Sequence, residues 1–128
     1  MSAPTARTDR LSIDVLRPEH ADLLFVDLED ERIYRYLLDR PPASRESLRV
    51  HYERLIAGPG PDASEQWFNW VMAEGATLRP IGTLQATVQP ADCRALVAYT
   101  LFPRYWKRGF ATEGVAWLLD QLRALPGI

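Results

Sequence analysis

The sequence contains one cysteine, two histidines and no apolar run long enough to cross a membrane. Because Cys93 is alone, neither an intramolecular disulfide nor a cysteine zinc cluster can form. His20 and His51 are isolated from each other, and we expect them to be structural or solvated rather than catalytic or metal-binding. The first ten residues have no apolar segment of the kind that secretory signal peptides require. We therefore expect a cytoplasmic protein without a bound metal.

The chain also lacks an excess of positive charge. Fifteen lysines and arginines stand against seventeen acidic residues, and the net charge is -2. A protein that binds nucleic acid in general usually carries a strongly basic surface, so we exclude nucleic acid as a partner. The 128 residues, 47% hydrophobic and 25% charged, are typical of one soluble domain, which we assign to residues 1–128.

The first half of the chain is predicted to contain one strand and two helices, over residues 10–15, 18–29 and 45–57. The strand alternates apolar and polar residues, and the first helix has apolar residues at helical spacing. Ser44 is a good N-cap for the second helix, with Glu46 in its first turn to meet the helix dipole. Residues 1–8 are small and polar and are expected to fray. Residues 32–38 fit a short helix or a turn.

The second half is predicted to form three strands and a final helix. The strands, rich in aromatic and β-branched residues and separated by short turns, cover residues 66–74, 81–89 and 94–102. The helix should turn one apolar face to the sheet, formed by Ala111, Val115, Leu118, Leu119 and Leu122. The order strand, two helices, three strands, helix predicts a mixed α/β fold with a largely antiparallel central sheet and helices packed on it.

The turn before the final helix concentrates positive charge. Arg104, Lys107 and Arg108 surround it, and Gly109 lies where the helix begins. The first N–H groups of a helix have no partners within it, and a glycine lets a ligand approach the backbone closely. This pattern favours a phosphate site, although a solvated basic turn would have the same composition.

The stretch "YWKRGFATEG" resembles the acetyl-CoA-binding segment of the GCN5-related N-acetyltransferase (GNAT) superfamily. It is most like the branch that contains the ribosomal-protein N-terminal alanine acetyltransferases. The matching positions are Tyr105, Trp106, Gly109, Ala111, Thr112 and Glu113. Lys107 and Arg108 replace the branch's Gly and Lys, so one flexible position is lost. The segments "VAYTLFPRYW", "LRPEHADLLF" and "IGTLQA" extend the similarity over most of the chain.

The resemblance implies that the chain takes acetyl-CoA as a cosubstrate and acetylates a primary amine, on a protein N-terminus or a small molecule. The pyrophosphate would bind to backbone amides of the residues Lys107, Arg108, Gly109, Phe110, Ala111 and Thr112. The pantetheine arm would align with backbone groups of Thr100, Leu101 and Phe102. An N–H aimed at the acetyl carbonyl would stabilise the developing oxyanion, so no covalent intermediate on the protein is needed.

The sequence departs from the family at two points. An acidic residue that often serves as general base is replaced by Leu96, and Glu74 and Asp92 are the alternatives considered for it. The family's fifth strand and its later elements are absent, so we expect a fragment or a shortened homologue. An inactive acyl-CoA-binding module is therefore an alternative function. We expect the exposed strand edge to recruit a second copy or a separate C-terminal segment.

Overall fold

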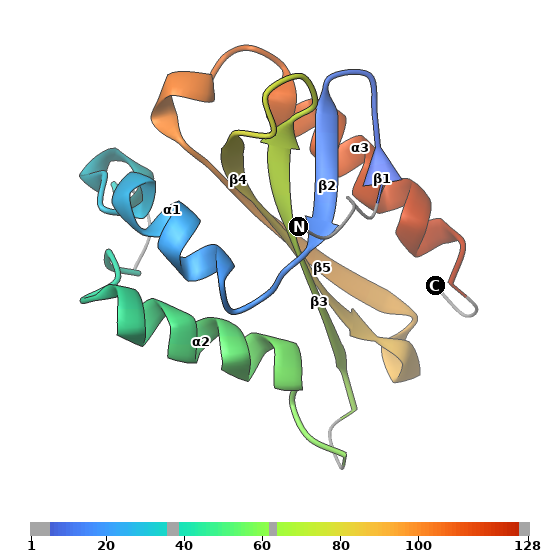
Figure 1. The fold of residues 1–128 in the computed structure, drawn as a ribbon. Helices are drawn as coiled ribbons and strands as arrows, with labels where there is room; N and C mark the ends of the chain where they lie inside the picture. Colours follow the sequence, from blue (N-terminus) through green and yellow to red (C-terminus); the bar gives the residue numbers. More distant parts are fainter. Residues whose placement is uncertain (1–5, 36–38, 62–63, 126–128) are drawn as a thin grey trace.

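The computed structural model describes residues 6–35, 39–61 and 64–125, which form a five-stranded sheet with helices on both faces (Figure 1). The strands are β1 (Ala6–Arg7), β2 (Leu11–Val15), β3 (Gln66–Glu74), β4 (Pro80–Gln89) and β5 (Arg94–Leu101). The helices are α1 (His20–Leu28), α2 (Arg45–Ala57) and α3 (Phe110–Arg123), and short 3-10 turns cover Glu31–Tyr34, Pro90–Asp92 and Pro103–Tyr105. The predicted mixed α/β fold is confirmed. Among these described helices, none is both long and apolar enough to cross a membrane.

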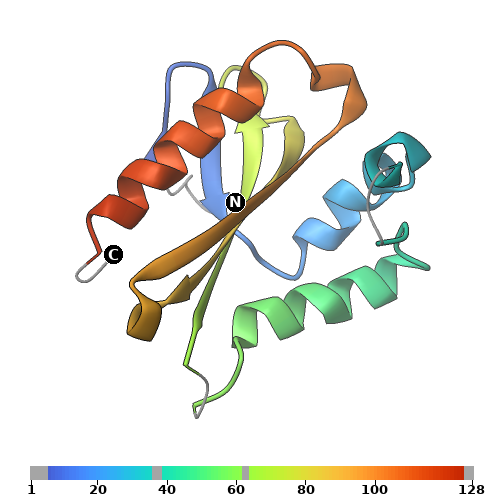
Figure 2. The ribbon, with the colours of Figure 1, turned by 180° about the vertical axis from the view of Figure 1, so that it is seen from behind.

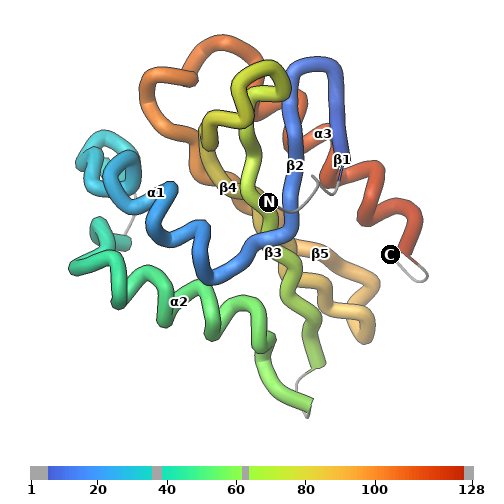
Figure 3. The backbone as a smooth tube through the Cα atoms, in the orientation of Figure 1, coloured from blue at the N-terminus to red at the C-terminus, as the bar shows by residue number. Residues whose placement is uncertain are grey.

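The sheet is antiparallel, and its strands lie side by side in the order of the sequence. Helices α1 and α2 cover one face, where α1 contacts β4 and α2 contacts β3. Helix α3 covers the other face and contacts β2, β4 and β5 (Figures 1 and 2). The β1–β2 hairpin and the start of α3 meet at one end of the molecule (Figure 3). Strand β5 is the last strand of the described sheet, so its outer edge has no neighbouring strand there.

Most predicted boundaries are confirmed. Strand β3 covers the predicted residues, and β4 and β5 differ from the prediction by one residue at one end. Ser44 caps α2 as expected: its hydroxyl accepts the Ser47 N–H, and the Ser47 hydroxyl accepts the Ser44 N–H, both at 3.0 Å. This reciprocal pair satisfies two backbone donors that the helix leaves unpaired.

Two local predictions need correction, and a third is confirmed. Residues 6–7, expected to fray, form strand β1 and pair with β2, whereas residues 1–5 lie outside the described residues. The segment 32–38, predicted as a short helix or a turn, indeed contains most of the 3-10 turn Glu31–Tyr34, and its residues 36–38 lie outside the described residues. Helix α1 starts at His20, two residues later than predicted, because a turn precedes it.

Helix α3 packs on the sheet through a row of residues four apart, which are Phe110, Gly114, Leu118 and Leu122. A Cβ at Gly114 would lie 2.5 Å from the Met72 Sδ, so the helix approaches the sheet most closely at this glycine. The row through Gly114 faces the sheet directly. Leu119, predicted to face the sheet beside Leu118, is instead 37% exposed. Trp117 is half-buried and its ring meets Trp70 edge to face, with the ring centres 5.3 Å apart.

Candidate functional site

The loop between β5 and α3 has an unusual backbone. Two of its residues adopt the left-handed region, Lys107 with a φ of 61° and Gly109 with a φ of 80°. Glycine takes this conformation without steric cost, whereas lysine does so at a cost. Lys107 occupies the position where the resembling branch has a glycine, the residue that would adopt this conformation without the cost.

The N-terminus of α3 presents unpaired backbone donors. Gly109 is the N-cap and has no side chain to cap the helix. The first hydrogen bond of the helix runs from the Glu113 N–H to the Gly109 carbonyl at 3.1 Å. The N–H groups of Phe110, Ala111 and Thr112 precede this bond and therefore have no acceptor within the helix. These donors, together with the positive end of the helix dipole, are suited to an anion.

The predicted phosphate-site residues do not all contribute in the same way. Lys107, Arg108, Gly109 and Thr112 are exposed, whereas the Phe110 side chain is 4% exposed and belongs to the core. Phe110 and the half-buried Ala111 can therefore offer only backbone groups.

The three cations of the loop also differ. Arg104 forms an ion pair with Asp27 at 3.2 Å, so its charge is partly neutralised and directed toward α1. The Arg108 guanidinium lies 5.1 Å from the centre of the Phe110 ring and remains exposed. Lys107 takes part in none of the ion pairs found among the described residues. Lys107 and Arg108 are therefore better placed than Arg104 to attract an anion.

A second set of contacts, which the sequence did not reveal, joins the β1–β2 turn to α3. The Glu113 carboxylate accepts hydrogen bonds from the Thr8 hydroxyl and from the backbone N–H and Nε of Arg10, the last two at 2.8 Å each. Burial tends to raise the pKa of Glu113, but these bonds hold it below its usual value. The partners lie more than 100 residues apart, so no local pattern marks them.

The end of β5 offers backbone groups on one side only. The Phe102 N–H donates to the Ile81 carbonyl at 2.9 Å, so it is not free for a ligand. Hydrogen bonding alternates along an antiparallel strand, so Thr100 also faces β4, whereas the backbone groups of Tyr99 and Leu101 point outward. Of the three predicted pantetheine residues, only Leu101 lies on the open edge. Tyr99, which the sequence prediction omitted, lies there too.

A groove of about 390 Å³ runs beside this edge. Its lining residues are Arg32, Ile33, Arg35, Tyr99, Thr100, Leu101 and Trp106. The Trp106 indole N–H donates to the Leu101 carbonyl at 2.7 Å, so this side chain covers one of the two edge residues.

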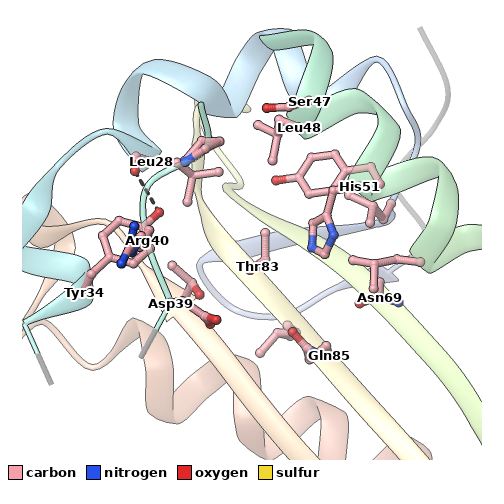
Figure 4. Close-up of a pocket in the computed structure, with 16 residues that line it drawn as sticks. Leu28, Tyr34, Asp39, Arg40, Ser47, Leu48, His51, Asn69, Thr83 and Gln85 are labelled. Carbon is pink, nitrogen blue, oxygen red and sulfur yellow. Dashed lines mark hydrogen bonds between the residues drawn. The ribbon is translucent and has the colours of Figure 1, made fainter. Parts of the chain in front are cut away.

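A larger pocket, of about 530 Å³, lies between α2 and the sheet (Figure 4). His51 extends from α2 toward the strands, and Asn69, Thr83 and Gln85 project from the sheet (Figure 4). Asp39 also lines it. Arg40 lines it too, so the pocket combines an acid, a guanidinium, an imidazole and neutral polar groups.

Two tyrosines and one strand residue complete this pocket. Burial raises the pKa of Tyr52 far above its usual value, and the Tyr34 hydroxyl donates to the Leu28 carbonyl at 2.8 Å. Both tyrosines are therefore neutral near pH 7. Thr100 lines the pocket as well as the groove beside β5, so this residue borders both cavities.

The two histidines have different environments. His20 is buried, and its Nδ1 accepts the Arg17 N–H at 2.8 Å. Its pKa is lowered, first by burial and then by the charge of Arg17, which fits the expected structural role. His51 is exposed, and its place in the pocket was not anticipated.

Neither acid considered as a general base reaches these cavities. Glu74 ends β3 and Asp92 lies in the turn before β5, and neither lines the groove or the pocket. Leu96, at the position where the branch often has an acid, is 51% exposed on β5.

Comparison with known proteins places these features in a family. The family profile of the acetyltransferase (GNAT) domain matches residues 10–128, and no curated protein sequence matches the chain significantly. A solved putative acetyltransferase from T. thermophilus has a TM-score of 0.74 and 21% identity, covering 95% of this chain and 61% of its own. RimL, the ribosomal L7/L12 alpha-N-protein acetyltransferase in complex with coenzyme A, has a TM-score of 0.75 and 15% identity, with coverage of 92% and 66%.

A third similar structure is spermidine N-acetyltransferase from Vibrio cholerae in complex with CoA and spermine. It has a TM-score of 0.69 and 18% identity, with coverage of 90% of this chain and 64% of its own. The chain thus spans about two thirds or less of the length of each of these three proteins. Because the sequence identities are low, the similarity to these structures concerns the fold alone. The family profile itself covers nearly all of the sequence, including the β5 edge and the loop before α3. The chain belongs to the GNAT acetyltransferase family.

Proposed function

We propose that this chain binds acetyl-CoA and transfers the acetyl group to a primary amine, as a member of the branch that contains the ribosomal-protein N-terminal alanine acetyltransferases. The observation that carries the proposal is the start of α3, where unpaired N–H groups and Gly109 follow the open end of β5. The coenzyme A complexes of RimL and of the Vibrio enzyme support a CoA site in this fold.

The phosphates would bind at the loop, and the thioester arm would follow the edge of β5. The backbone N–H groups from Lys107 to Thr112 act as donors, and the charges of Lys107 and Arg108 increase the attraction. The backbone groups of Tyr99 and the N–H of Leu101 would face the arm, whereas the Leu101 carbonyl already accepts the Trp106 indole N–H. A backbone N–H directed at the acetyl carbonyl stabilises the negative charge that develops on its oxygen during attack.

The pocket between α2 and the sheet would receive the amine, because Thr100 borders both this pocket and the groove along β5. The amine nitrogen attacks the carbonyl carbon, the C–N bond forms and the C–S bond breaks. The nitrogen loses a proton, and the CoA thiolate takes one up. Asp39 and His51 line the pocket and can accept the proton directly or through water.

Two measurements test the proposal together. Calorimetry with CoA measures binding, and thiol release from acetyl-CoA measures turnover on a peptide with an N-terminal alanine, a polyamine and an amino-sugar antibiotic. Release with the peptide supports the proposed branch, whereas release with another amine alone would change the acceptor and retain the acetyltransferase. The absence of saturable CoA binding would overturn the proposal.

A second candidate function is an inactive acyl-CoA-binding module. Leu96 in place of an acid favours it, since Glu74 and Asp92 lie outside both cavities. This module would bind CoA saturably and release no thiol with any amine. Without CoA, the open edge of β5 would in either case pair with a second copy of the chain or with a separate C-terminal segment.

A further inference from the structure

The β1–β2 turn reaches across to the loop before α3 through one side chain, that of Arg10. Its Nε donates to the Glu113 Oε1 at 2.8 Å, and its Nη1 donates to the Arg108 carbonyl at 2.8 Å. Its guanidinium carbon lies 4.3 Å from the centre of the Phe110 ring. A single planar guanidinium thus connects the first turn of α3 with the loop that precedes it.

The bond to the Arg108 carbonyl has a consequence for the next amide. The peptide between Arg108 and Gly109 is trans, so its C=O and N–H point in opposite directions. Because Arg10 holds the carbonyl on its own side, the Gly109 N–H is directed away from Arg10. In a loop without this bond, the same peptide could rotate and turn its carbonyl oxygen toward a bound anion. The partial negative charge of that oxygen would repel the anion.

The contacts to Glu113 remove a second obstacle to anion binding. Glu113 lies in the first turn of α3, where its carboxylate could compete with an anionic ligand for the free N–H groups. The Thr8 hydroxyl and two donors of Arg10 occupy its oxygens instead. The carboxylate is thereby fixed on the side of the β1–β2 turn.

We propose that Arg10 is a positioning residue for the CoA pyrophosphate: it orients the Arg108–Gly109 peptide and keeps Glu113 away from the donors of α3. This inference rests on the proposed function, because it assigns a role at the same site. Arg10 acts through the backbone and through Glu113, and its own guanidinium is occupied by these partners. Lysine could keep the charge but could not make both bonds in the same plane.

Binding measurements on variants of the full chain separate this role from simple charge. We expect Arg10→Ala to weaken CoA binding about tenfold or more, the effect of losing a charge-assisted hydrogen bond, and Arg10→Lys to recover only part of it. The matched control is Arg7→Ala on the same hairpin, which removes an equal charge. The Arg7 guanidinium makes a long 3.5 Å contact with the Gly75 carbonyl, so this variant should bind CoA nearly as the wild type does.

Amide NMR gives a readout that a purely structural role would not change. In the wild type the Gly109 amide signal should shift on addition of CoA, whereas in a folded Arg10→Lys variant this shift should shrink while the shifts of the β5 amides persist. If the wild type, Arg10→Lys and a folded Arg10→Ala bind CoA with equal affinity, Arg10 is not a positioning residue. That result would leave the proposed function standing. An equal loss of CoA affinity in Arg7→Ala would show that the effect comes from net charge, and would also overturn the role assigned to Arg10. Failure of the wild type to bind CoA would instead overturn the proposed function, and this inference with it.

Discussion

The substitution Gly109→Asp tests the phosphate site most directly, because it adds a negative charge where the donors converge. The cost to the fold should be small. Aspartate tolerates the left-handed region better than most residues, and the new Cβ would approach only the Arg10 Nη2, at 3.2 Å, which is the guanidinium nitrogen that makes neither of the two bonds described above. We expect a loss of about 1 kcal/mol in the free energy of unfolding.

The cost to CoA binding should be much larger. Two like charges about 4 Å apart repel each other by about 4 kcal/mol at an effective dielectric constant of about 20. If salt and solvent reduce this by half, about 2 kcal/mol remains, which corresponds to a roughly thirtyfold loss of affinity. Gly109→Asn is the matched control, because it has the same shape and backbone preference without the charge.

Calorimetry at two salt concentrations completes this test. Gly109→Asn should lose affinity only modestly, through its Cβ, and the gap between the two variants should narrow at high salt because the charge is screened. Thermal unfolding and circular dichroism establish that both variants are folded. A folded Gly109→Asp protein that binds CoA within about threefold of the wild type would refute the phosphate site at α3.

Three further variants test the packing and the loop. Leu118→Ala should cost about 2–5 kcal/mol of stability in chemical denaturation, since Leu118 is fully buried, whereas Leu119→Ala should cost less than about 1 kcal/mol; equal costs would mean that the helix is rotated. Lys107→Gly should relieve the left-handed strain and raise stability by up to about 1 kcal/mol, and a clear loss of stability would contradict the backbone described for this residue. Arg104→Ala should change CoA affinity less than about threefold, because Asp27 already pairs with this charge, and a larger loss would assign Arg104 to the phosphate site.

Local signals account for the features that were predicted well from the sequence. Alternation marked the first predicted strand, aromatic and β-branched residues between short turns marked the next three, and Ser44 marked the start of α2. All of these signals depend on residues close together in the chain. Gly109 was predicted to lie where the last helix begins, and it is the N-cap of α3, with a φ of 80° that glycine adopts without strain.

The exposure of Leu119 could not be predicted from local signals. Helical spacing allows either side of the apolar stripe on α3 to face the sheet, and the close approach of α3 to the sheet at Gly114 decides which side does.

The contacts that complete the candidate site depend on tertiary structure. Arg10 and Glu113 are 103 residues apart; Glu113 is one of the positions that match the acetyl-CoA-binding segment, but nothing near it in the sequence indicates Arg10 as its partner. His51 reaches the pocket only because α2 lies over the strands that carry Asn69 and Gln85. The pantetheine prediction named consecutive residues, whereas an antiparallel strand turns only alternate residues outward, so Tyr99 and Leu101 share the edge.

The outer edge of β5 connects the proposed chemistry with the association of the chain. Val97 and Tyr99 are 40% and 54% exposed there, beside backbone groups that have no partner strand in the described sheet. Such an edge readily pairs with another strand. A CoA arm bound along Tyr99 and Leu101 would occupy the same backbone groups, so the ligand and a second copy of the chain should compete for them.

We therefore expect the purified chain to dimerise or aggregate, and CoA to shift it toward the monomer. Light scattering with and without CoA measures both effects. Val97→Lys should reduce association, because a charge on an exposed edge opposes strand pairing, and should leave the N-terminus of α3 intact. A chain that remains a stable monomer without ligand and binds CoA at full strength would show that the edge of β5 needs no partner. Association that CoA leaves unchanged would place the contact between copies elsewhere on the molecule.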